Sequence, residues 1–290
     1  MKKWIAPIII CILLLAIVAY AVLCMAAGPR FMEYDLNEDG TYTVVGIGRC
    51  TDTNLEIPAT YRGAAVTRIG SFAFWNCSNL TSITIPDSVT SLAQGVFRDC
   101  YNLTSITVDA NNSTYHSEGN CIIYTKTYTL VAGCMNSVIP DYVTIIDAHA
   151  FDDCRGLTSI TIPDSVTIIG DRAFYWCGSL TSITIPEGVT SIGDSAFVRC
   201  RSLTSITIPD GVTSIGNAAF DHCFNLTSIT IPDSVTSIGD KVFYCCFDLT
   251  SITYTGTVEQ WETIKLGSNW NEEVPATEVI CSDGTVSLQN

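Results

Sequence analysis

A unit of 23 residues recurs along most of this chain. The clearest copies begin at Leu157, Leu180, Leu203 and Leu226, and each reads L-T-S-I-T-I-P-(D/E)-x-V-T-x-I-G-x-x-x-F-x-x-C. One such unit is too short to bury its apolar side alone, so successive units must stack. The period therefore predicts a solenoid in which each unit forms one coil.

The order of residues within a unit predicts what each part of a coil forms. Ile183 and Ile185 alternate with polar residues, which predicts a short strand with one buried face, and Pro186 ends that strand. Gly193 permits a turn, and the segment from Ala196 to Cys200 fits one helical turn packed on the strands. The predicted fold class is an α/β solenoid with a parallel β-sheet on one face and short helical turns on the other.

The repeats occupy residues 67–253, between two segments that depart from the pattern. Residues 31–66 predict an N-terminal cap, and residues 254–290 a C-terminal cap with a short helix at Gln260–Ile264. Phe97 and Phe151 are 151 − 97 = 54 residues apart, or 23 + 31, which predicts one irregular longer coil at 104–139. The β-forming segment 121–131 within it is expected to bulge out as a hairpin.

Residues 1–30 differ in composition from the rest. Lys2 and Lys3 precede an uncharged apolar run from Ile5 to Ala27, which is long enough to cross a bilayer as a helix. We expect a transmembrane signal anchor at residues 5–27, or alternatively a signal peptide cleaved near Ala27. In both cases the two lysines keep the N-terminus in the cytoplasm and place the repeats outside.

Charge limits the partners of the repeats. The chain carries 29 acidic and 14 basic residues. Residues 1–30 hold three of the basic residues and no acid, which leaves 29 against 14 − 3 = 11 and a net charge of −18 for the remainder. Such an acidic domain repels phosphates, so nucleic acid is excluded as a partner.

Fourteen cysteines outside the cytoplasm would ordinarily indicate disulfides. Here seven of them share one position of the repeat, where a column of small apolar thiols fills a core well. Neighbouring coils lie within disulfide reach, so both buried free thiols and disulfide pairing stay open. No C-x-x-C motif or nearby histidine pair accompanies these cysteines, so no metal is expected. The seven are Cys77, Cys100, Cys154, Cys177, Cys200, Cys223 and Cys246.

The repeat resembles the leucine-rich repeats of the BspA-type bacterial surface-antigen family. The resemblance rests on successive copies of L-T-S-I-T-I-P-D-S-V-T-S-I-G-D-x-A-F-x-x-C and extends to Tyr254-Thr-Gly-Thr-Val-Glu-Gln-Trp261 and Cys281-Ser-Asp-Gly284. It implies a leucine-rich-repeat solenoid, secreted or displayed at the cell surface, that binds host or neighbouring-cell proteins. It brings no catalytic residues. The asparagine ladder usual in leucine-rich repeats is not expected, because Ser or Gly takes its position, as at Ser165 and Gly188.

Variation between copies is concentrated beside the Phe and Cys of each unit. Large aromatic and arginine side chains at exposed, variable positions are those that dominate interface energies. We expect them to form a stripe that, with the polar strand edge at Ser182, Thr184, Ser205 and Thr207, binds a protein; ordinary drift at unconstrained positions is the alternative. The stripe comprises Trp75, Arg98, Tyr101, Arg155, Tyr175, Trp176, Arg199, Arg201, His222, Phe224, Tyr244 and Phe247.

Other chemistries have little support. A predicted column of acids could hold Ca²⁺, but capping of turns with solvent screening fits better, because calcium needs six or more oxygens in a cage. The column consists of Asp164, Glu187, Asp210 and Asp233. The three histidines share no repeat position and no G-x-S-x-G occurs, so neither an enzyme nor a cofactor is expected.

The sequence therefore predicts an extracellular protein-binding protein that acts in adhesion or recognition, with a host, neighbouring-cell or matrix protein as its ligand. A structural or antigenic surface element without a fixed partner is the alternative. A hydrolase of surface polymers is a remote one, because no clustered acid/base pair is found.

Overall fold

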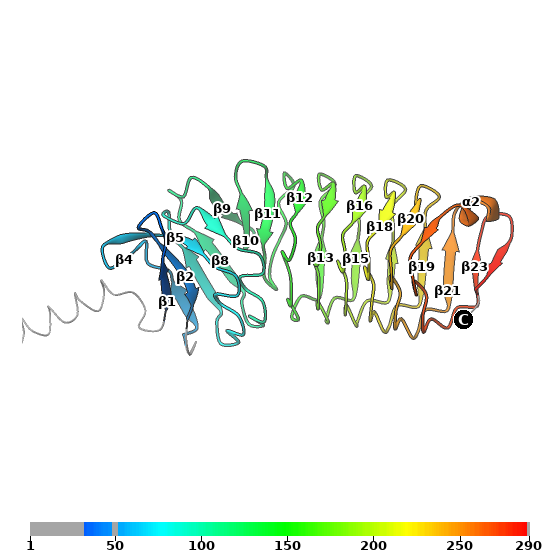
Figure 1. Cartoon of the computed structure of the whole chain (residues 1–290), viewed down its shortest axis with the longest axis horizontal. Coiled ribbons are helices and arrows are strands. Elements are labelled where there is room, and N and C mark those ends of the chain that lie inside the picture. The colour runs from blue at the N-terminus through cyan, green and yellow to red at the C-terminus, as the bar shows by residue number, and fades with distance from the viewer. Residues whose placement is uncertain (1–31, 48–51, 289–290) are drawn as a thin grey trace, which may run out of the picture.

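The computed structural model describes residues 32–47 and 52–288, which form an elongated stack of coils (Figure 1). Each regular coil contains two short strands. The first carries the Ser-Ile-Thr motif, and the second carries the Ser-Ile, Ser-Leu or Ile-Ile that follows the proline turn. Equivalent strands of neighbouring coils pair in parallel and in register, as Ser159 pairs with Ser182 and Ile169 with Ile192. Two sheets, parallel except for antiparallel strands at one end of each, therefore run along the C-terminal part of the molecule.

The first sheet has seven strands and the second has nine. The first sheet is made of β13 (Ser159–Thr161), β15 (Ser182–Thr184), β17 (Ser205–Thr207), β19 (Ser228–Ile231), β21 (Ser251–Tyr254), β23 (Glu278–Ile280) and β24 (Thr285–Ser287). The second sheet is made of β22 (Lys265–Leu266), β20 (Ser237–Ile238), β18 (Ser214–Ile215), β16 (Ser191–Ile192), β14 (Ile168–Ile169), β12 (Ile145–Ile146), β11 (Thr129–Ala132), β10 (Cys121–Tyr124) and β9 (Tyr115–Glu118).

The N-terminal part of the stack has its own two sheets. Five strands form one of them: β1 (Glu33–Leu36), β2 (Tyr42–Gly46), β4 (Thr60–Tyr61), β5 (Ala64–Ile69) and β7 (Ser91–Leu92). Three strands form the other: β3 (Asn54–Glu56), β6 (Ser82–Ile85) and β8 (Ser105–Val108).

The side of each coil that carries Phe and Cys contains consecutive turns and no helix, so the expected helical turns are wrong. Its amide groups alternate between two kinds of partner. The Tyr175 N–H donates three residues back to Arg172, whereas the Phe174 and Trp176 N–H groups donate to Ala196 and Val198 of the next coil. Left-handed backbone at Arg172 and Trp176, with φ of 55° and 60°, produces this alternation and is incompatible with an α-helix.

The phenylalanines from Phe151 to Phe243 form a continuous stack inside the coils, and Phe74 stacks on Phe97 in the N-terminal core. Neighbouring rings from Phe151 to Phe220 are 5.2–5.4 Å apart between centroids and nearly coplanar in orientation, with interplanar angles of 2–4°. Each ring is buried together with the strand isoleucines of its coil. The register predicted from the repeat is therefore confirmed.

The column of cysteines also joins coil to coil. The Cys200 thiol donates to the Phe174 carbonyl oxygen at 3.3 Å, and Cys223 makes the equivalent bond to Phe197 at 3.2 Å. All 11 described cysteines are free thiols. Burial raises the pKa of the Cys246 thiol to about 12, so it stays protonated near neutral pH.

A second ladder, which the sequence analysis missed, follows the glycine that ends each second strand. The Asp194 N–H donates to the Asp171 carboxylate at 2.8 Å, and the Asn217 N–H donates to Asp194 at 2.7 Å. The pattern continues through Asp240 to Ser268. The usual asparagine position of leucine-rich repeats holds Ser165 or Gly188 in this chain, and the Asp/Asn ladder lies instead at Asp171, Asp194 and Asn217.

Segment 121–131 forms the expected hairpin, with β10 antiparallel to β11, but the hairpin lies in the stack and does not bulge out of it. Strands β9, β10 and β11 form an antiparallel meander, and β11 pairs in parallel with β12, which extends the second sheet. Ile122, Ile123 and Leu130 are fully buried because the meander lies where the two hydrophobic cores of the stack meet. The inserted residues therefore add core instead of a surface hairpin.

The C-terminal end is closed by α2 (Val258–Glu262), which begins with a capping box between Thr257 and Gln260. Its Trp261 is buried and contacts the Tyr254 ring, with the ring centroids 5.2 Å apart. No helix of residues 32–47 and 52–288 is long and apolar enough to span a membrane. The predicted anchor at residues 5–27 lies outside the described residues.

Candidate protein-binding site

Trp176 is the centre of the predicted stripe. Three guanidinium groups lie over its ring: Arg155 at 4.6 Å, Arg199 at 4.4 Å and Arg201 at 5.2 Å from a ring centroid. Such contacts contribute roughly 0.5–1 kcal/mol each at exposed sites. Arg201 also lies 5.4 Å from the Phe224 ring, so it links Trp176 to the aromatic residues of the following coils.

The stripe continues toward the C-terminus as stacked aromatic rings. Phe224 and Phe247, which hold equivalent places in neighbouring coils, stack with ring centroids 5.5 Å apart, and Phe247 is 53% exposed. The centroid of the His222 ring lies 5.8 Å from that of Tyr244 and 5.5 Å from that of Phe224. This half offers an accessible apolar surface next to Arg199 and Arg201, neither of which has an ion pair among the described residues.

The N-terminal half of the stripe is occupied by internal pairing. Arg155 forms ion pairs with Asp153 at 2.7 Å and Asp99 at 3.2 Å, and Arg98 pairs with Asp153 at 3.3 Å. Tyr101 donates its hydroxyl proton to Asp99 at 2.8 Å. The irregular coil has no Phe-Cys turn of its own, and these ion pairs join the turns on its two sides. Arg98 and Arg155 therefore stabilise the stack at this point.

The carboxylates of this network differ in pKa. Burial raises the pKa of Asp153 even though Arg155 and Arg98 oppose the shift. Burial would also raise the pKa of Asp99, but hydrogen bonds from Tyr101 and Trp75 and the charge of Arg155 lower it below the usual value. Neither acid is among the residues predicted for the stripe, although each is the second residue after a repeat Phe, within the variable segment.

The second residue after each Phe has left-handed backbone in every unit. Its φ is 59° at Asn76, 60° at Trp176, 60° at Arg199 and 59° at His222. This conformation costs a residue other than Gly roughly 1–2 kcal/mol. Glycine would adopt this backbone without that cost, but all seven units carry another residue at this position.

The remaining predicted residues lie at two other places. Trp75 is 59% exposed and donates its indole N–H to Asp99. The guanidinium carbons of Arg98 and Arg172 lie 5.8 and 5.2 Å from the centroid of the Tyr175 ring. Ser182, Thr184, Ser205 and Thr207 are exposed on the first sheet and do not take part in the aromatic and arginine contacts.

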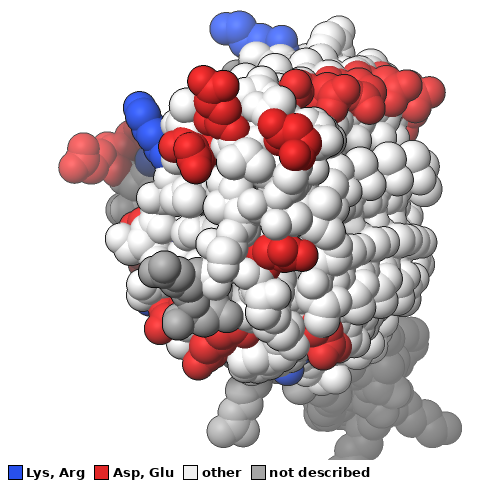
Figure 2. Space-filling model, turned by 90° about the vertical axis from the view of Figure 1, so that its right-hand side faces the viewer, with Lys and Arg blue, Asp and Glu red and all other residues white. Residues whose placement is uncertain are grey.

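Acidic side chains gather in a row along one edge of the stack, beside a broad uncharged side (Figure 2). The predicted column of Asp164, Glu187, Asp210 and Asp233 is exposed throughout. Within residues 32–47 and 52–288, no three His, Cys, Asp or Glu side chains come together as metal ligands. His149 and His222 pair with Asp152 and Asp221, and His116 contacts Thr125 and Tyr142.

A family model described as the BspA type leucine-rich repeat region matches six copies, at residues 49–130 and 144–266. The chain belongs to this family. These ranges cover most of the coils that carry the Phe stack. No curated protein matches the chain significantly.

Solved structures of leucine-rich-repeat proteins share the fold. A leucine-rich cell surface protein of Faecalibacterium prausnitzii is 23% identical, with a TM-score of 0.56 over 83% of this chain and 98% of that one. A leucine-rich repeat protein of Bacteroides ovatus is 26% identical, with a TM-score of 0.54 over 88% and 70%. The pneumococcal vaccine antigen PcpA is 18% identical, with a TM-score of 0.55 over 76% and 70%.

Proposed function

We propose that this protein is displayed outside the cell and binds another protein through the stripe from Trp176 to Phe247. The observation that carries the proposal is the clustering of Trp176, Arg201, Phe224 and Phe247 into one contiguous surface. Trp, Tyr and Arg are the residue types enriched where binding energy concentrates.

The partner surface has a definable chemistry. Arg199 and Arg201 are positive charges on an otherwise acidic molecule, and their guanidinium groups rest on aromatic rings. A partner that offers carboxylates beside apolar side chains would pair with the arginines and cover the rings of Phe224 and Phe247. Adhesion to a host, neighbouring-cell or matrix protein is the role we favour.

The experiment is binding of the purified full-length chain, in mild detergent, to an array of extracellular-matrix and bacterial surface proteins. Wild type is compared with a variant carrying Trp176→Ala, Arg201→Ala and Phe224→Ala, and with a matched control carrying Ser205→Ala and Thr207→Ala on the first sheet. We expect saturable binding that the first variant loses by at least tenfold and the control keeps. Equal binding by wild type and the stripe variant contradicts the proposal, and no saturable binding at all favours the structural or antigenic role.

A surface location is part of the same proposal. It is supported by the apolar run from Ile5 to Ala27 behind two lysines and by the similarity to the leucine-rich cell surface protein of Faecalibacterium prausnitzii. N-terminal sequencing of the protein recovered from producing cells distinguishes the anchored form, which retains Met1 or Lys2, from a form cleaved near Ala27. Recovery of the protein only from the cytoplasmic fraction would contradict both forms.

A further inference from the structure

The first sheet is interrupted at the irregular coil. Its strand β13 pairs with β15 on one side, but it has no strand partner among the described residues on the side of the preceding coil. The N-terminal three-stranded sheet ends at β8, and no strand follows it in that sheet. The repeat therefore exposes a parallel sheet edge in the middle of the stack, where neighbouring coils normally cover each other.

The backbone direction at this edge follows from the equivalent coils. The Ile57 N–H donates to the Thr84 carbonyl of the next coil at 3.1 Å, so Thr84 in β6 faces the coil before it. Thr161 has the same place in its Ser-Ile-Thr motif as Thr84. Because backbone groups two residues apart in a strand face the same neighbour, Ser159 and Thr161 both direct their N–H and C=O groups to the unpaired side. No backbone hydrogen bond joins them to residues 136–139.

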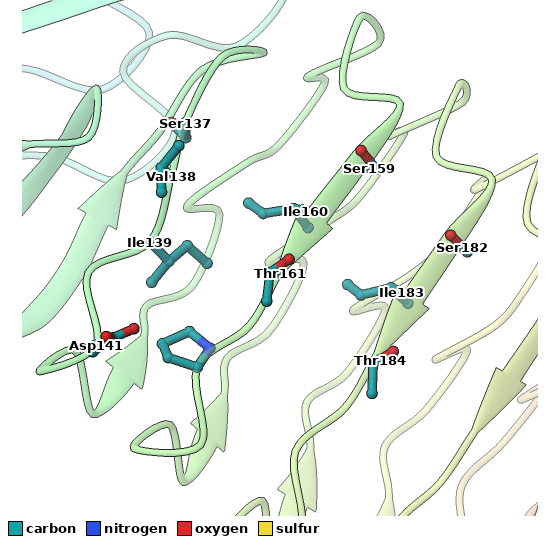
Figure 3. Close-up of a pocket in the computed structure, with 11 residues that line it drawn as sticks. Ser137, Val138, Ile139, Asp141, Ser159, Ile160, Thr161, Ser182, Ile183 and Thr184 are labelled. Carbon is teal, nitrogen blue, oxygen red and sulfur yellow. The ribbon is translucent and has the colours of Figure 1, made fainter.

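A groove of about 490 Å³ lies along this edge. Figure 3 shows the segment from Ser137 to Asp141 on one side of it and β13, followed by β15, on the other. The Val138 N–H donates away from the groove, to the Gly119 carbonyl at 2.8 Å. The volume lies within the range of about 300–1,000 Å³ usual for binding pockets.

The groove combines three features that a bound peptide strand would need. The β13 edge offers backbone donors and acceptors, which recognise any extended polypeptide. Val138 is 69% exposed and gives an apolar contact at the rim. Asp141 is an exposed carboxylate at the end of the groove where parallel strands finish, so it favours a basic residue near the carboxyl end of the incoming segment.

We propose that this groove binds an extended segment of a partner protein as an additional parallel strand on β13, with a Lys or Arg of that segment paired to Asp141. The site is separate from the stripe around Trp176 and does not depend on it. In every regular coil the same edge is occupied by a strand of sequence Ser-Ile-Thr, so a segment of alternating polar and β-branched residues fits best.

The test measures fluorescence anisotropy of the labelled peptide Thr-Ser-Ile-Thr-Ile-Lys with the full-length chain. We expect saturable binding, weakened at least tenfold when Glu replaces the peptide Lys and when Thr161→Pro removes the groove-facing N–H. Thr161→Val is the matched control, since it keeps the N–H and should bind like wild type. The variant carrying Trp176→Ala and Arg201→Ala should also bind the peptide, which separates this site from the stripe.

Two results would overturn the proposal. One is the absence of saturable binding, and the other is undiminished binding by a Thr161→Pro variant that melts at the wild-type temperature. If that variant unfolds, hydrogen exchange on the wild-type protein decides instead. The peptide must then slow exchange of the Ser159 and Thr161 amides, which start faster than those of Ser182 and Thr184, and unchanged exchange rejects the site.

Discussion

At the scale of single residues, the glycine after each second strand is required by the distance between coils. A Cβ at Gly193 would lie 2.6 Å from the Asp171 backbone nitrogen of the preceding coil, whereas a Cβ at Gly178 meets nothing closer than 3.9 Å. The turn at Gly193 was predicted from the conformational freedom of glycine. The structure replaces that reason with a steric one.

Gly193→Ala should therefore lower the free energy of unfolding by about 1–3 kcal/mol, the usual cost of forcing atoms into a packed site. Gly178→Ala is the control and should change it by less than about 0.5 kcal/mol. Urea denaturation followed by circular dichroism measures both. Equal effects of the two substitutions would show that the coils can move apart to admit a methyl group.

The buried thiols make stability depend on pH. Burial raises the pKa of Cys246 and of Cys121 to about 12 from an ordinary value of 9.0. The folded state then keeps its protons while the unfolded state loses them, so the stabilisation is complete below pH 9 and is lost as the pH rises toward 12. Denaturation at pH 8 and pH 10.5 should show a lower free energy of unfolding at the higher pH. Cys246→Ala should reduce that difference, and an unchanged difference would mean that the thiol is accessible.

At the scale of elements, the ladder of Asp and Asn side chains ties successive coils along one edge. The Asp194 carboxylate accepts the Asn217 N–H, and the Asp194 N–H donates to Asp171. Asp194→Ala removes the acceptor and should lower the free energy of unfolding by about 1 kcal/mol. Asp210→Ala, at an exposed acid without such a bond, should leave it unchanged. Thermal melting compares the two, and equal melting temperatures would contradict a structural role for the ladder.

Much of the regular stack could be predicted from the sequence. The Ser-Ile-Thr strands, the register of Phe174 on Phe197 and the stacking of Phe224 on Phe247 follow from identical spacing, because equal coils can only align in register. The Trp176 cluster was also recognisable, since its residues are the variable ones beside the fixed Phe and Cys.

The irregular parts could not be predicted in the same way. The left-handed backbone at Trp176 and Arg199 is not marked by glycine in the sequence, so the spacing of the apolar residues there predicts a helical turn instead. The insertion at 104–139 has no second copy in the chain for comparison, and its β-branched residues fit a surface hairpin and a buried meander equally well. The ion pairs of Arg155 with Asp99 and of Arg98 with Asp153 depend on contacts across that insertion, between residues 56 and 55 positions apart.

At the scale of the whole molecule, negative charge is distributed along the stack and opposes its compact form. The chain has a net charge of −15, and its acidic column is exposed. Raising the ionic strength from 10 to 150 mM shortens the screening length from about 30 to about 8 Å and should raise the melting temperature. CaCl₂ and NaCl at equal ionic strength should act alike. A larger rise with CaCl₂ would indicate a specific calcium site on the acids.

The Phe stack has a consequence for how such a chain can change length. Because each coil presents the same ring, thiol and strand to the coil before it as to the coil after it, a gene duplication of one whole unit adds a rung that already fits both neighbours. Every such event would lengthen the molecule by about 4.8 Å. The two ends of the stack would keep their structures. Evolution can therefore change the length of the protein, and the distance over which it reaches, without changing the fold of the individual coil.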